Sequence, residues 1–165
     1  MRLHAATVLL DTLGLDDLDG VHEWALAGTL PIGVDVEGSD LDVLIHAEDI
    51  DAVHQAMRGR FAHRAGFATW RHSREDAWCA AFEEEGFLVE LFIQAMPVAQ
   101  QRAHRHMLAE RRLLRAHGTP LRDQVRALKS QGIKTEPAFA RALGIPGDPY
   151  TALLDDDVVT AWCRR

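Results

Sequence analysis

Two aspartates, Asp40 and Asp42, stand one residue apart at the start of an apolar segment. Side chains two positions apart in a β-strand point to the same face, so both carboxylates would lie side by side. Carboxylates held this closely repel each other and favour a divalent cation. Magnesium prefers such oxygens and keeps water or phosphate in its other positions. The pair alone is a weak indication, because Asp-x-Asp is a common surface spacing.

A third carboxylate, Glu90, interrupts the apolar segment from Phe87 to Ile93. Burying an ionised glutamate in a strand is costly unless a positive charge compensates it. An arginine partner, or a position on the edge of a sheet, would also explain the residue. We favour a cation shared with Asp40 and Asp42.

The dipeptide Gly28-Thr29 ends another apolar segment and opens a glycine-containing loop, ten residues before Asp40. Glycine lets backbone N–H groups approach a phosphate, and the threonine hydroxyl adds a further donor. Most Gly-Thr pairs are ordinary turns. The pair indicates a phosphate site only in combination with the carboxylates that follow it in the sequence.

Together these segments resemble the DNA polymerase beta-like nucleotidyltransferase superfamily, over roughly residues 20–95. The segment from Gly28 to Gly33 resembles its glycine-serine loop, with Thr29 in place of serine, and Gly38 to Asp42 resembles its metal-binding strand. The resemblance implies Mg²⁺ or Mn²⁺ as cofactor, with two ions when nucleotide is bound. It implies metal ligands and catalytic residues at Asp40, Asp42 and Glu90, and nucleotide contacts at Gly28, Thr29, Gly38 and Ser39.

A closer resemblance, covering nearly the whole chain, is to the bacterial family called domain of unknown function 4269. That family is predicted to be nucleotidyltransferase-like and has no assigned substrate, so it sharpens the fold more than the function. The segments that carry the resemblance are 27–32, 38–42, 105–107, 132–140 and 147–150.

The loop after Gly28-Thr29 departs from the superfamily pattern. Many small nucleotidyltransferases carry an arginine or lysine there, whereas this chain has Leu30, Pro31 and Ile32. Either a positively charged side chain from another part of the chain neutralises the phosphates, or triphosphate binding is weak. Lys134, predicted to lie beside a helix N-terminus that attracts anions, is our candidate nucleotide-binding cation. The alternative is a helix start capped by Thr135 with no ligand.

His106 and Glu110 lie four residues apart on a predicted helix and could form an intrahelical pair facing the sheet. A contact with a ligand and a hydrogen-bonded pair in the core are both compatible with this spacing.

The pattern of apolar residues predicts an α/β (α+β) fold, with a mixed sheet of about five strands packed with helices and a helical C-terminal region. Residues 1–96 would form the core, and residues 97–165 would pack on it as part of one compact unit. A polar turn at 83–86 would close a hairpin, and a long helix would end near Gly118. Predicted strands are 24–28, 41–45, 67–71, 77–82 and 87–93. Predicted helices are 3–13, 48–61, 99–118, one that is capped by Thr119 and ends at Gly132, one after 135, and 157–163.

Length and charge exclude several classes of protein. A chain of 165 residues fits one domain, and its 25 acidic against 18 basic residues give a formal charge of -7. A net acidic protein repels phosphate backbones, so nucleic acid is an unlikely partner on this argument. No run approaches the roughly 18 apolar residues of a membrane span. Two cysteines are too few for a disulfide framework, and we expect a cytoplasmic protein.

These expectations converge on a metal-dependent nucleotidyltransferase. It would transfer a nucleoside monophosphate from a nucleoside triphosphate to a hydroxyl of a small molecule or a protein, releasing pyrophosphate. The alternative is an inactive nucleotide- or partner-binding protein of the same fold, including an antitoxin-like role. The acceptor, the preferred base, the oligomeric state and catalytic competence stay open at this point.

Overall fold

The computed structural model describes residues 2–165 and divides into two compact units. Residues up to Gly28, together with Asp40–Gln101, form the first, which we call the sheet unit. Thr29–Ser39 and Arg102–Arg165 form the second, which we call the helical unit. The segment 29–39 therefore groups with the C-terminal helices, whereas the sequence placed it with the core of residues 1–96.

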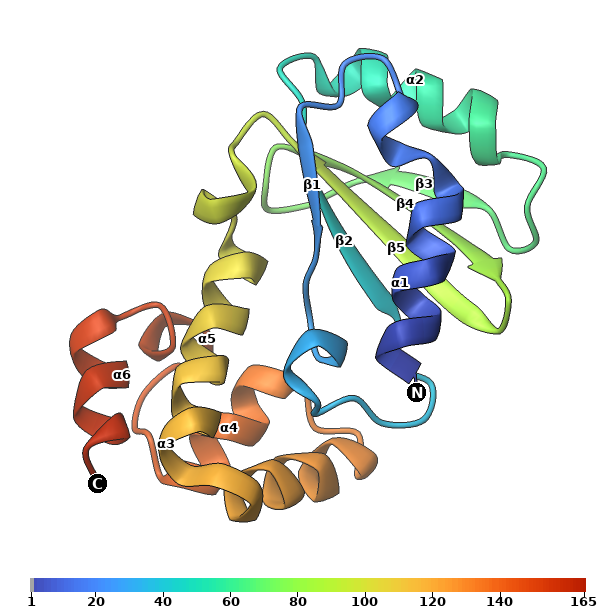
Figure 1. Cartoon of the computed structure of the whole chain (residues 1–165). Coiled ribbons are helices and arrows are strands. Elements are labelled where there is room, and N and C mark those ends of the chain that lie inside the picture. The colour runs from blue at the N-terminus through green and yellow to red at the C-terminus, as the bar shows by residue number, and fades with distance from the viewer. Residues whose placement is uncertain (1) are drawn as a thin grey trace. The chain divides into compact units, whose positions relative to one another are not determined.

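The sheet unit is built on five strands in the order β1-β2-β5-β4-β3 (Figure 1). The pairing of β2 with β5 is parallel and the other three pairings are antiparallel, so the predicted mixed sheet is confirmed. Because β5 is the central strand, the sheet-edge explanation for Glu90 is wrong. The strands are β1 (Glu23–Leu26), β2 (Leu41–His46), β3 (Ala68–Arg71), β4 (Ala77–Glu84) and β5 (Phe87–Gln94).

The hairpin between β4 and β5 is tighter than expected. Its loop contains only Glu85 and Gly86, with φ of 47° and 80°. Positive φ at both positions belongs to the type I′ turn, whose twist matches that of the flanking strands. The turn therefore lets β4 extend two residues beyond its predicted end, to Glu84, which pairs with Phe87 at the predicted start of β5.

Two helices and two short 3₁₀ segments complete the sheet unit. Helix α2 (Ile50–Phe61) begins after Asp49, whose carboxylate accepts a hydrogen bond from the Ala52 N–H at 2.9 Å. It packs against β4 and β5. The remaining elements are α1 (Arg2–Leu13), η1 (Leu15–Asp17) and η3 (Val98–Gln100).

The helical unit is organised around α3 (Arg102–Ser130), which is interrupted at Gly118. The φ of 66° and ψ of -150° at Gly118 are not helical, so the predicted break is confirmed. Both halves present apolar residues to the core of this unit, which also buries Phe139. The other elements are η2 (Leu30–Ile32), α4 (Thr135–Leu143), α5 (Pro149–Ala152) and α6 (Asp156–Cys163).

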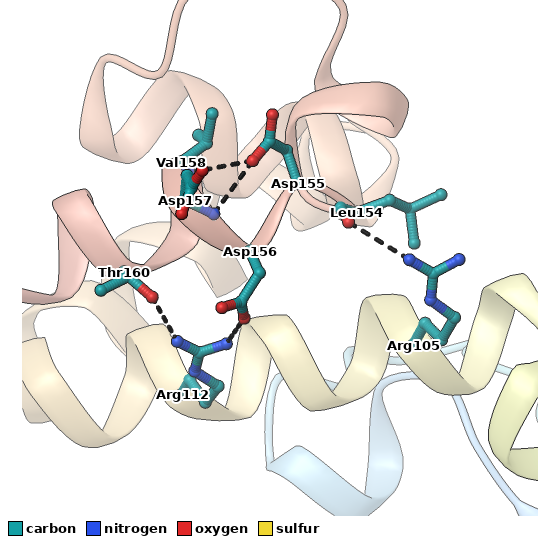
Figure 2. Close-up of polar contacts among 8 residues, drawn as sticks. All are labelled: Arg105, Arg112, Leu154, Asp155, Asp156, Asp157, Val158 and Thr160. Carbon is teal, nitrogen blue, oxygen red and sulfur yellow. Dashed lines mark hydrogen bonds and ion pairs between the residues drawn. The ribbon is translucent and has the colours of Figure 1, made fainter.

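Polar contacts fasten α6 and the residue before its cap to α3 (Figure 2). Arg112 forms an ion pair with Asp156 and donates a hydrogen bond to the Thr160 hydroxyl at 2.7 Å. Two helical turns earlier on α3, Arg105 donates to the Leu154 carbonyl at 3.3 Å. Arg112 therefore contributes to the packing of α6 on α3.

Asp155 caps the N-terminus of α6 (Figure 2). Its carboxylate accepts hydrogen bonds from the N–H groups of Asp157 and Val158, at 2.9 and 3.2 Å. A carboxylate at this end also interacts favourably with the helix dipole. Within residues 2–165, no helix has the length and apolar character needed to cross a membrane.

Candidate metal and nucleotide site

Three carboxylates converge in the sheet unit. Asp42 on β2 is directly opposite Glu90 on β5 in the parallel ladder, and Asp40 precedes β2 by one residue. One oxygen from each of these three side chains lies within 4.8 Å of the other two. All three residues are half-buried. The structure thus brings together the three residues that the sequence selected as metal ligands.

Charge repulsion makes this cluster a candidate cation site. At an effective dielectric constant near 20, each pair of unit charges at such a spacing repels by about 3 kcal/mol. A divalent cation would replace this repulsion by attraction. The three candidate ligands are all carboxylates, and hard ions such as Mg²⁺ and Mn²⁺ prefer oxygen ligands. The chemistry of the donor set therefore fits the implied cofactor.

Gly28 leaves the space that the Asp42 carboxylate occupies. A Cβ atom at Gly28 would lie 1.9 Å from Asp42 Oδ2 and 2.8 Å from its Cγ. Gly28 also has a φ of 69°, and the preceding Ala27 N–H donates to the Asp42 carbonyl at 2.7 Å. The sequence assigned Gly28 to phosphate binding, and the structure adds a steric requirement beside the metal ligands.

Thr29 belongs to the helical unit, where it is 7% exposed. Its carbonyl accepts a hydrogen bond from the Val34 N–H at 3.1 Å, which closes the loop around the short helix η2. Gly33 ends η2 with a φ of 72°. The contact of Thr29 with a phosphate stays a prediction.

Gly38 and Ser39 form the turn that leads into Asp40. The Ser39 hydroxyl accepts a hydrogen bond from the Val36 N–H at 2.9 Å, and the Ser39 N–H donates to the Val36 carbonyl at 3.0 Å. Gly38 has a φ of 78°, which disfavours any residue with a side chain. These contacts give both residues a role in shaping the turn, and their nucleotide contacts stay predictions.

Lys134 occupies the N-cap position of α4 and is exposed. It makes no side-chain capping bond, and Thr135 is already the first helical residue. The interpretation of Thr135 as the N-cap is therefore wrong. The Thr135 hydroxyl instead accepts a hydrogen bond from Lys129 Nζ at 3.0 Å. Lys134 does lie at a helix N-terminus, and its contact with a nucleotide stays a prediction.

His106 contacts two other helices of its unit. Its Nδ1 lies 3.3 Å from a carboxylate oxygen of Glu136 on α4, and its Nε2 lies 2.8 Å from the Tyr150 carbonyl on α5. Both ring nitrogens thus contact partners distant in sequence, rather than only Glu110 one turn away. No local spacing pattern indicated Glu136, which lies 30 positions from His106.

The environment of Glu136 favours its charged form. Burial opposes ionisation, but the hydrogen bond with His106 and the backbone hydrogen bond at Glu136, together with the charges of His106 and Lys129, hold its pKa below the usual value of 4.5. This carboxylate therefore stabilises the helix packing of the unit. Nothing in its contacts relates it to a ligand.

Solved structures that this chain resembles in fold include nucleotidyltransferases. A crystal structure of the Cid1 poly(U) polymerase with MgGTP bound superposes with a TM-score of 0.63 at 15% identity, covering 86% of this chain and 48% of that chain. A Cid1 structure described for RNA terminal uridylyl transferase activity has a TM-score of 0.64 at 14% identity, with 86% and 47% coverage. A cytoplasmic RNA terminal U-transferase has a TM-score of 0.64 at 16% identity, with 86% and 46% coverage.

These similarities establish a nucleotidyltransferase fold. The chain spans about half the length of the solved structures that it matches. No curated protein matches its sequence. One family model does match: that described as "Domain of unknown function (DUF4269)", over residues 10–155.

Proposed function

The chain belongs to the family of domain of unknown function 4269, and on that premise we propose that it is a metal-dependent nucleotidyltransferase. It transfers a nucleoside monophosphate from a nucleoside triphosphate to a hydroxyl of a small molecule or a protein, and pyrophosphate leaves. The observation that carries this proposal is the convergence of Asp40, Asp42 and Glu90 on a nucleotidyltransferase fold.

Each residue has a distinct task in this proposal. Asp40 and Asp42 hold the cation that binds the triphosphate, and Glu90 joins them in holding a second ion near the acceptor hydroxyl. Bound magnesium supplies charge neutralisation on the phosphates and lowers the pKa of the attacking hydroxyl. Gly28 and Thr29 direct backbone and hydroxyl donors at the outer phosphates. The protein itself contributes positioning and electrostatic stabilisation.

An inactive nucleotide-binding protein is the second candidate, and one observation favours it. The loop that follows Gly28 folds into the apolar segment Leu30–Ile32 and carries no cation of its own. Weak neutralisation of the leaving pyrophosphate would allow binding without efficient transfer. Such a protein would act through a partner, as an antitoxin-like protein does.

A label-transfer assay separates these two functions. The protein is incubated with the four nucleoside triphosphates, labelled at the α-phosphate, and with pools of small hydroxyl compounds, proteins and RNA, in Mg²⁺, Mn²⁺ or a chelator. We expect cation-dependent release of pyrophosphate and label on one class of acceptor. Asp42→Asn should abolish both, whereas Asp49→Asn, which preserves the cap of α2, should not. Cation-dependent binding without transfer to any pool would favour the second candidate.

A further inference from the structure

Asp42 and Glu90 belong to a row of side chains that crosses the sheet, because residues paired in neighbouring strands share one face. At the β1 end of this row, the Ala27 N–H donates to the Asp42 carbonyl at 2.7 Å, and Ala27 is 1% exposed. The next residue, Gly28, leaves only the space that the Asp42 carboxylate fills. The row is therefore closed beside Asp42, and it can continue as a binding surface only on the side of Glu90.

On that side the row continues over two alanines. Ala81 on β4 pairs with Glu90 on β5, and Ala68 on β3 pairs with Ala81. The spacing of strands places these alanines about 5 and about 10 Å across the sheet from Glu90. Ala81 is half-buried and Ala68 is exposed. We call Ala81 and Ala68 the shelf, a strip of small side chains that starts beside the candidate metal ligands.

The shelf lies on the face of the sheet that is directed away from helix α2. The neighbouring side chains of β4 on the opposite face contact that helix: Trp78 stacks on His54 with ring centroids 3.7 Å apart, and Phe82 stacks on Phe61 at 4.9 Å. Side chains alternate along a strand, so Ala81, between Trp78 and Phe82 in sequence but out of phase with both, points the other way. The shelf and the carboxylates therefore share a face that α2 does not cover.

Larger apolar side chains flank the shelf on one side. Phe92, Cys79 and Trp70 form the adjacent row on the same face, paired in that order across β5, β4 and β3. Trp70 is 38% exposed, so part of its indole ring is available to a ligand. Burial raises the pKa of the Cys79 thiol to about 11, and the charge of Glu90 adds to this effect. The thiol is therefore neutral at pH 7, and this flank is apolar.

The other flank includes Leu88, which precedes Glu90 by two residues on β5 and is 42% exposed. A flat ring can lie on the two alanine methyl groups and contact the Trp70 indole, a favourable arrangement for aromatic groups. A sugar or another polyol in the same place would lose hydration of hydroxyl groups for which the shelf offers no side-chain partner. The shelf therefore favours a flat, apolar ligand with its polar end beside Glu90.

We propose that the shelf binds the acceptor, a small molecule whose hydroxyl group is attached to a flat, largely apolar ring system. This inference rests on the proposed function, because it takes the acceptor of a nucleotidyl group as its ligand. The hydroxyl oxygen forms a bond to the α-phosphorus of the triphosphate, and its proton passes to water. The bond from that phosphorus to the oxygen of the β-phosphate breaks, and pyrophosphate leaves with the electron pair. Ala68, Ala81 and Trp70 position the ring and select the acceptor.

A pair of probes with one carbon skeleton tests the shelf in the unaltered protein. 2-Naphthol is flat, whereas decahydro-2-naphthol carries the same hydroxyl group on a puckered, saturated skeleton. Each is titrated in Mg²⁺ into protein labelled for NMR at alanine methyl groups and tryptophan indoles. We expect 2-naphthol to shift the signals of Ala68, Ala81 and Trp70 and to bind about three- to tenfold more tightly than its saturated analogue. Equal affinities, or no shift at these three residues, would contradict the assignment.

Variants on the exposed end of the shelf test its role in transfer. Ala68→Leu fills this end and should raise the KM for 2-naphthol about tenfold in the label-transfer assay. Trp70→Ala should raise it about three- to tenfold. Ala62→Leu makes the same substitution at an exposed position after α2 and should leave the KM unchanged. Circular dichroism checks that each variant is folded, and a folded Ala68→Leu with the KM of the control would contradict the proposal.

The two possible failures give different results. If the wild type transfers nucleotide to no pool of acceptors, the proposed function and the role of the shelf fall together. If the wild type transfers nucleotide to saturated hydroxyl compounds, to proteins or to RNA, and Ala68→Leu does so as well as Ala62→Leu, only the role of the shelf is wrong.

Discussion

The sheet unit and the helical unit carry opposite net charges. The sheet unit holds 16 acidic and six basic residues, a formal charge of -10, whereas the helical unit holds nine acidic and twelve basic residues, a formal charge of +3. The value of -7 for the whole chain therefore conceals a basic unit. The net negative charge of the whole chain argues against a polyanionic ligand. This argument does not apply to the helical unit, because its own charge is positive.

The two units also hold their candidate functional groups by different means. In the sheet unit, the register between β2 and β5 places Asp42 beside Glu90, and Gly28 leaves room for the Asp42 carboxylate. In the helical unit, hydrogen bonds within the loop of residues 29–39 hold Thr29 and Ser39, whose contacts with a nucleotide stay predictions. We therefore expect substitutions in the first unit to affect metal binding most directly.

The largest effect is expected from substitutions in the carboxylate triad of Asp40, Asp42 and Glu90. Asp42→Asn or Glu90→Gln removes one of three converging carboxylates while preserving the size of the side chain. Turnover should fall at least about a hundredfold, as expected for loss of a group that stabilises the transition state. Steady-state assays and circular dichroism are the measurements, with Asp49→Asn as the control. Turnover equal to that of the wild type in either variant would contradict the proposed role of these carboxylates in catalysis.

Gly28→Ala is expected to have the next largest effect. The new Cβ would overlap the Asp42 carboxylate at 1.9 Å and would also be strained at a φ of 69°. Gly86→Ala is the matched control, because Gly86 has a φ of 80° with no atom within 4 Å. Both variants should lose about 1–2 kcal/mol from left-handed backbone strain, and Gly28→Ala should also lose Mg²⁺ affinity. Equal Mg²⁺ affinity in the two variants would show that the close approach is unimportant.

His54 should make the sheet unit sensitive to mild acid. It is 3% exposed and stacks on Trp78 with ring centroids 3.7 Å apart. Burial, followed by the charges of Arg58 and Arg71, lowers its pKa below 6.5 against the opposing effect of Asp51. The unfolded chain then binds the proton more readily, so stability should fall as the pH drops below about 6.5.

The variant His54→Phe keeps an aromatic ring in this position and removes the group that takes up the proton. Its free energy of unfolding, measured in urea between pH 8 and pH 5, should depend less on pH than that of the wild type. The same slope in both proteins would show that other groups cause the acid sensitivity.

The smallest effect is expected from Glu136 in the helical unit. Because its pKa is lowered in the folded state, its stabilising contribution is present above the usual value of 4.5 and is lost as the pH falls through the lowered value. Glu136→Gln should lack this contribution at pH 7 and speed amide hydrogen exchange in α4. Unchanged exchange would mean that the contact with His106 adds no stability.

Features determined by neighbouring residues could be predicted from the sequence. The cap at Asp49, the β4–β5 turn and the break at Gly118 each depend on side-chain type or permitted φ within a few residues. The carboxylates of the site were also identified, because Asp40 and Asp42 are close in sequence and Glu90 is conspicuous in an apolar strand.

Contacts between distant residues could not be predicted in this way. The approach of Gly28 to Asp42 depends on how β1 pairs with β2, and that of Gly33 to Arg122 depends on how a loop packs on α3. The sequence offered Glu110 as a partner for His106, and tertiary packing brings in Glu136, which no local spacing indicated. Residue types restrict such partners, and only the packed chain selects among them.

Calorimetric titration of the wild type and Asp42→Asn with each nucleoside triphosphate, in Mg²⁺ and in a chelator, tests the central claim most directly. The claim is that the three carboxylates hold a cation that binds the triphosphate. We predict binding by the wild type that requires Mg²⁺ and is lost in Asp42→Asn. Absence of binding by the wild type, or equal binding by the variant and in the chelator, would contradict the claim.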